Sequence, residues 1–107
     1  MIAGEPECKR IGRSVLPAVR ASVAELMHNR YKWRQERIAE GLGVVQVAVS
    51  KYLNGRYSKE VLKVRNYIRK MKLGDKIAAE LADGKRSSVV HGEMDRLCTE
   101  LVKAGVA

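Results

Sequence analysis

The sequence predicts an all-α protein of five to six helices, and three observations support this prediction. The chain has 107 residues, which is about the length of one domain. Apolar residues recur at helical spacing through most of it, whereas β-branched pairs typical of strands are confined to residues 44–45 and 89–90. Glycine, proline and helix-capping residues separate the periodic segments. We therefore expect a single helical domain over residues 1–107.

The first element is expected to be a helix preceded by an arm. Residues 1–12 carry two glycines and a proline, which favours an extended segment. Ser14 is a suitable N-cap, and Pro17 fits the first helical turn, where its missing N–H costs least. We expect this helix to end at about Arg30.

Two short helices should follow, over about 34–41 and 45–53, joined by a tight turn. Gly43 suits this turn because glycine adopts positive φ without steric cost, and Asn54–Gly55 ends the second helix. Ala39 provides a small side chain where the two helices cross. The apolar side chains expected to fix the crossing angle are Ile38, Leu42, Val44, Val49 and Tyr52.

The fourth and fifth helices are predicted from caps and apolar spacing. Ser58 can cap a helix that runs to about Lys72 and is stopped by Gly74. Asp75 can then cap a short helix that ends near residues 83–84.

The C-terminal helical extension is expected to cover about residues 75–107. Within it, residues 85–88 indicate a loop and residues 93–104 a last helix. This helix carries an apolar stripe, which either forms a dimer surface or packs onto the first helix of the same chain. The stripe consists of Met94, Leu97, Cys98, Leu101 and Val102.

Charge and targeting signals narrow the class of partner. The formal net charge is +9 at pH 7, which favours nucleic acid, a membrane surface or an acidic protein as partner, although some basic proteins bind none of these. No apolar run approaches the roughly 20 residues that span a bilayer, and the first residues lack the apolar stretch of a signal peptide. We therefore expect no membrane partner and a cytoplasmic location.

Residues 35–55 carry the most specific pattern, QERIAEGLGVVQVAVSKYLNG. This segment resembles the helix-turn-helix of lambda-repressor-like (XRE) transcription regulators. A wider resemblance, over about residues 5–57, is to small archaeal regulators of that type. Members of that group often have a cysteine near the N-terminus and a Cys-x-x-Cys near the C-terminus. Here Cys8 and Cys98 hold such places, but Leu101 replaces the last cysteine.

The resemblance implies a sequence-specific regulator that binds double-stranded DNA as a homodimer, with the helix at 45–53 in the major groove. Polar and small side chains on its outer face are expected to read base edges, and Gln46 suits adenine. The base-reading set is Gln46, Val47, Ser50, Lys51 and Asn54. The set expected to hold phosphates, which position the protein without specifying sequence, is Lys32, Arg34, Gln35, Arg56 and Tyr57.

The segment departs from the family pattern at both helix starts. Trp33 and Val45 stand where such regulators usually have a capping Ser or Thr, and each lost cap costs about 1 kcal/mol. Gly41 inside a helix costs about 1 kcal/mol relative to Ala. Trp33 is expected in the core more than stacked on a sugar or base. The basic run at residues 59–72 either extends the DNA footprint or is a solvated helix face.

The same composition and pattern also occur in proteins with other functions. A helix-turn-helix can serve as a scaffold in an antitoxin-like or adaptor protein, and a basic protein can bind DNA architecturally without sequence preference. RNA is less favoured because aromatic residues are 5% of the chain and Phe is absent. The sequence shows no acid–base couple and no glycine-rich phosphate-binding loop, so nothing in it indicates an enzyme.

No metal or cofactor is expected from the sequence. The possible ligands are two cysteines, Cys8 and Cys98, and two histidines, His28 and His91. They lack the close spacing of a metal motif. Cys98 is expected to behave as a small apolar residue, whereas Cys8 lies beside Lys9 and Arg10, a setting that favours a reactive thiolate.

Overall fold

The computed structural model describes residues 7–105, with side chains from residue 13 onward. Within this part the chain forms six helices and no strand, so the predicted all-α fold is confirmed. The helices are α1 (Glu7–Asn29), α2 (Gln35–Leu42), α3 (Gln46–Leu53), α4 (Lys59–Met71), α5 (Asp75–Ala82) and α6 (Ser87–Lys103).

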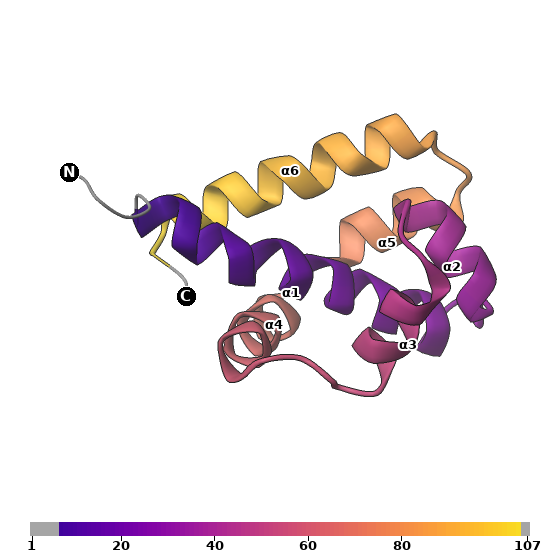
Figure 1. The fold of residues 1–107 in the computed structure, drawn as a ribbon. Coiled ribbons are helices and arrows are strands. Elements are labelled where there is room, and N and C mark those ends of the chain that lie inside the picture. The colour runs from indigo at the N-terminus through magenta and orange to yellow at the C-terminus, as the bar shows by residue number, and fades with distance from the viewer. Residues whose placement is uncertain (1–6, 106–107) are drawn as a thin grey trace.

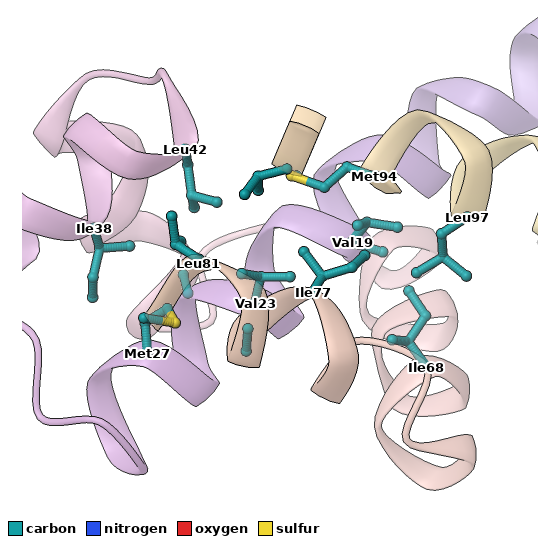
Figure 2. Close-up of a cluster of buried hydrophobic side chains, with 14 of the residues drawn as sticks. Val19, Val23, Met27, Ile38, Leu42, Ile68, Ile77, Leu81, Met94 and Leu97 are labelled. Carbon is teal, nitrogen blue, oxygen red and sulfur yellow. The ribbon is translucent and has the colours of Figure 1, made fainter. Parts of the chain in front are cut away.

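Helix α1 is the centre of the fold and packs against each of the other five helices (Figure 1). Helix α6 runs antiparallel along one side of it, and α4 lies on another. Side chains from five helices converge on α1 in one continuous core (Figure 2). Fully buried valines and Met27 line α1 at helical spacing, because a central helix must be apolar on several faces.

The start of α1 corrects the prediction for the N-terminal segment. Residues 7–12 are helical, so the expected arm is wrong for them, and residues 1–6 lie outside the described part. Ser14 is therefore not an N-cap, and Pro17 lies inside the helix rather than in its first turn. Proline in a helix interior costs about 3 kcal/mol. The burial of Val15 and Val19 on either side of it offsets that cost.

Helices α2, α3 and α4 begin and end within about one residue of the expected positions. Gly43 adopts φ 69°, the left-handed conformation that the turn requires. The Ser58 hydroxyl accepts a hydrogen bond from the Val61 N–H at 3.2 Å, which confirms the predicted cap of α4.

Two boundaries in the C-terminal half differ from the prediction. Lys72, not Gly74, is the left-handed residue that ends α4, with φ 56°. Gly74 is instead the N-cap of α5 and is buried beside Ser22, so Asp75 is the first helical residue rather than the cap. Helix α6 begins at Ser87, six residues before the expected start, because Val90 is fully buried.

The apolar stripe of α6 packs within the chain. Met94, Leu97 and Leu101 are buried, and α6 packs along α1. Cys98 and Val102 are partly buried against the same core. Of the two uses left open by the sequence, this stripe therefore serves the intrachain core.

Among the described residues, no helix is both long enough and apolar enough to cross a membrane.

Candidate functional site

The predicted site residues gather on two short helices and the turn between them, which we call the α2–α3 unit (residues 35–53). Ile38 and Leu42 of α2 and Val49 of α3 are at most 1% exposed and anchor the unit in the core. Figure 2 shows Ile38 and Leu42 pointing into the cluster that contains Leu81 of α5. Apolar packing therefore fixes the inner side of the unit against the core, and its outer side is available to solvent.

Two close contacts with the C-terminal helices hold the turn of the unit. His91 of α6 donates a hydrogen bond from Nε2 to the Leu42 carbonyl at 3.0 Å. A Cβ on Gly43 would lie 2.9 Å from the His91 ring, and a Cβ on Gly41 would lie 3.0 Å from Leu81. Gly41, which costs stability inside a helix, is thus explained by the close approach of α5.

Helix α3 presents one side to solvent and packs the other against the core. Of its eight residues, all described, Val49 is fully buried, and Tyr52 and Leu53 are partly buried against the core. The predicted base-reading residues Gln46, Val47, Lys51 and Asn54 are exposed, and Ser50 is half-buried. Together these five side chains form what we call the α3 face.

Side-chain hydrogen bonds order both ends of the α3 face. The Gln46 amide donates from Nε2 to Glu36 Oε1 at 2.9 Å, and Asn54 donates from Nδ2 to Ser50 Oγ at 3.3 Å. A glutamine amide has two N–H donors and a carbonyl acceptor. Gln46 therefore keeps one donor and its acceptor while it is held by Glu36, and this pair is what a bidentate contact to adenine uses.

The first turns of α2 and α3 lack side-chain caps. The N-cap residues Arg34 and Val45 have extended backbone, with ψ 157° and 154°, but neither forms a side-chain cap hydrogen bond. The sequence placed the first of these caps at Trp33, one residue too early. The initial N–H groups of a helix need acceptors. An uncapped N-terminus on an exposed surface is therefore suited to accept an anion such as a phosphate.

The predicted phosphate-holding residues flank the α3 face but differ in exposure. Lys32, Arg34 and Arg56 are exposed, and Gln35 is half-buried at the start of α2. Tyr57 is half-buried, packs against the core and lies beside Arg65, and burial raises the pKa of its phenol. Its position is largely explained by packing.

Trp33 packs against the core, which is the position that the sequence favoured over stacking on a sugar or base. It is partly buried against the core, its backbone N–H donates to the Met27 carbonyl at 3.0 Å, and the Arg37 guanidinium lies 3.8 Å from its ring centroid. This packing fixes the connector between α1 and α2.

The cations of the basic run at residues 59–72 are exposed, except Arg65. Arg65 turns inward to an ion pair with Glu25 of α1 at 3.3 Å, whereas Lys59, Lys63 and Arg69 are exposed. Burial raises the pKa of Glu25, although Arg65 and Arg69 act to lower it. Arg65 therefore joins α4 to α1 and is not part of an outward charged face.

The cysteines and histidines do not form a metal centre among the described residues, where no three potential ligands gather. Burial raises the pKa of the Cys98 thiol to about 11. The thiol therefore stays neutral and packs against the core as a small apolar side chain would. The side chain of Cys8 lies outside the described residues.

Three contributors to the site were missed by sequence reasoning. Val45 is 70% exposed, which adds an apolar side chain beside Val47 at the start of α3. Glu36 orients Gln46, and His91 holds the turn from a helix 49 residues away in sequence. Only Val45 had a local signal, since it was noted as an apolar residue in a capping position.

Comparisons with protein-family models, with curated proteins and with solved structures find no match for this chain.

Proposed function

We propose that this protein is a sequence-specific DNA-binding regulator whose α2–α3 unit is a helix-turn-helix of the lambda-repressor-like (XRE) type, with α3 in the major groove. The observation that carries the proposal is α3 itself. It is anchored by the buried Val49, with Tyr52 and Leu53 packed against the core, and the unit exposes Gln46, Val47, Lys51 and Asn54. A helix with one narrow buried edge and a polar outer face fits the width of a major groove.

The arrangement assigns different roles to the two kinds of residue. Gln46, held by Glu36, is the adenine-reading side chain, and Val45 and Val47 provide apolar surface for thymine methyl groups. The uncapped starts of α2 and α3, with Arg34 and Lys32, supply donors and charge for phosphates. The net charge of +9 supports an anionic partner.

We further propose that the protein acts as a homodimer on a near-palindromic site. One recognition helix reads only a few base pairs, and two of them set about 34 Å apart, one turn of DNA, multiply the specificity.

Selection of random duplex DNA by the purified protein tests the proposal. We expect an enriched inverted repeat. Salt-sensitive binding with no enriched sequence would point instead to an architectural role. Failure to bind any duplex at low salt would overturn the proposal, and a scaffold for protein interactions would then be the better reading.

Matched variants separate reading from positioning. Gln46→Ala should relax preference at one position per half-site, by about 1–3 kcal/mol. Arg34→Ala should weaken all duplexes alike and reduce the salt slope by about one unit. Lys103→Ala is the control, because it removes a charge at the end of α6 remote from α3 (Figure 1) and should change neither measurement. Equal effects of Gln46→Ala on all sequences would contradict its assigned role.

A further inference from the structure

A cavity of about 740 Å³ lies beside the α2–α3 unit. The C-terminal half of α1, the end of α4 and the start of α5 form most of its walls. Gln35, at the start of α2, and Leu53–Asn54, at the end of α3, complete it. Its volume is within the range of about 300–1,000 Å³ that small-molecule sites occupy.

The cavity wall contains a buried hydroxyl without a partner. Ser22 of α1 is 5% exposed, and its Oγ has no hydrogen-bond partner among the described residues. A buried polar group left unsatisfied costs about 1–3 kcal/mol. Gly74 lines the same cavity, and an added Cβ there would lie 3.6 Å from the Ser22 Cβ, which is an ordinary van der Waals contact.

Charges at the cavity leave a positive excess. Both lining carboxylates are already paired, Glu25 with Arg65 at 3.3 Å and Asp75 with Arg30 at 3.1 Å. By contrast, the two lining cations at the end of α4, Arg69 and Lys72, form no direct ion pair in the described part of the chain. Burial raises the pKa of Glu25 and Arg69 acts at longer range to lower it, so an anion bound between Arg69 and Lys72 would find charge that the protein neutralises only in part.

Apolar side chains line the same space. Leu26 of α1, Leu53 of α3 and Ile68 of α4 contribute to its walls. The other lining residues are mostly polar or charged, so these three side chains form an apolar patch within a polar cavity. The cavity thus combines a cationic end, a hydroxyl that lacks a partner and an apolar patch.

We propose that this cavity binds a small organic oxyanion that carries an apolar group, with the anion at Arg69 and Lys72 and a hydrogen bond to Ser22. A second step depends on the proposed function. Because Gln35 and Asn54 belong both to the cavity wall and to the proposed DNA contact, an occupied cavity changes the affinity for DNA.

Binding is tested on the full-length protein by NMR titration with phenyl phosphate and with inorganic phosphate, at constant ionic strength. Phenyl phosphate should shift the backbone amides of Ser22, Leu26 and Ile68 and bind at least about tenfold more tightly, because the walls remove its ring from water. No shift at these amides up to about 10 mM phenyl phosphate, a weak-binding limit, would overturn the proposal. Shifts spread evenly over all basic residues would also overturn it.

Charge-matched variants identify the site. Arg69→Gln with Lys72→Gln should weaken phenyl phosphate binding by more than about tenfold, as expected for two charge-assisted contacts. Lys63→Gln with Lys70→Gln removes the same charge from exposed positions of α4 outside the cavity and should leave binding unchanged. Equal losses in the two pairs would show general attraction only. Ser22→Ala, which removes only the hydroxyl, should weaken binding a few-fold without loss of folding.

The coupling to DNA has its own readout. Affinity for the selected duplex, measured with and without saturating phenyl phosphate, should differ in the parent protein and not in the Arg69→Gln, Lys72→Gln variant. An unchanged affinity would overturn the coupling while the NMR titration still supports the site. A protein that binds phenyl phosphate but no duplex would overturn the proposed function alone.

Discussion

Helices α3 and α4 are neighbours in sequence but are held in place by different means. Helix α4 begins at the Ser58 cap, buries three side chains and is joined to α1 by the Arg65–Glu25 ion pair. Helix α3 begins without a side-chain cap and buries Val49 alone. A helix that is to expose most of its surface to a partner has few side chains left to anchor it. Its position must therefore be set by its neighbours.

The largest expected effect comes from the buried valines of the two helices. Val49→Ala and Val64→Ala each remove two methyl groups from a fully buried position and should each reduce the free energy of unfolding by about 2–3 kcal/mol. Hydrogen exchange should then distinguish them. In Val49→Ala the amides of α3 should lose more protection than the rest of the chain, because only the partly buried Tyr52 and Leu53 still anchor it. Uniform loss of protection in both variants would show that α3 is as firmly held as α4.

The next effect concerns the turn that precedes α3. Gly43 and Gly55 both have positive φ, 69° and 70°, so alanine at either position is strained by about 1–2 kcal/mol. Only at Gly43 would the new Cβ also meet His91, at 2.9 Å. Gly43→Ala should therefore lower the free energy of unfolding more than Gly55→Ala in denaturant titrations. The excess should shrink in a His91→Ala background, and an excess that persists there would mean that the ring is not its cause.

Helix caps should give changes of about 1 kcal/mol in opposite directions. Ser58→Ala removes the bond to the Val61 N–H and should destabilise the protein by that amount. Val45→Ser places a hydroxyl on a residue that already has cap geometry, with φ −78° and ψ 154°, and should stabilise it by a similar amount. DNA affinity should fall in the same variant, because the hydroxyl would occupy the N–H groups proposed to bind phosphate and because Val45 is also proposed to contact thymine methyl groups. A more stable protein with unchanged affinity would contradict both proposed roles of this position.

The last effect is absent near neutral pH and tests the packing of α6 against the core. Burial raises the pKa of Cys98 from its ordinary value of 9.0 to about 11. The thiol thus stays neutral in the folded protein at pH values where it ionises in the unfolded chain. Its contribution to stability is present below about pH 9 and lost as the pH rises toward 11. In a Cys8→Ser background, alkylation of the native protein should be slow at pH 8 and accelerate toward pH 11, whereas the denatured protein should react readily at pH 8. Fast native alkylation at pH 8 would place Cys98 outside the core.

Local signals in the sequence were enough to predict α2, the turn at Gly43, α3 and the capped start of α4. In each case the deciding group acts within a few residues of itself, as the Ser58 hydroxyl does on Val61. The errors have the opposite cause. Pro17 inside α1 and the early start of α6 at Ser87 are decided by burial of Val15, Val19 and Val90 against other helices, which no local pattern reports.

The candidate site also contains residues predicted from local patterns and residues whose roles depend on distant segments. The residues of the α3 face were predicted because they share one side of a single short helix. Glu36 and His91 were missed because their roles depend on which residues the turn and the C-terminal helix bring close. Sequence alone left the stripe on α6 with two uses, and burial of Met94 and Leu97 assigns it to the core.

The contacts of His91 with the Leu42 carbonyl and of Leu81 with Gly41 have a consequence for protein engineering. A chimera that transplants only residues 35–55 would carry every predicted reading side chain but lose both contacts at the turn. The transplanted segment would expose Leu42 and leave its crossing angle unset. The smallest portable unit therefore includes α5 and α6 together with α1, although neither α5 nor α6 carries a predicted reading residue.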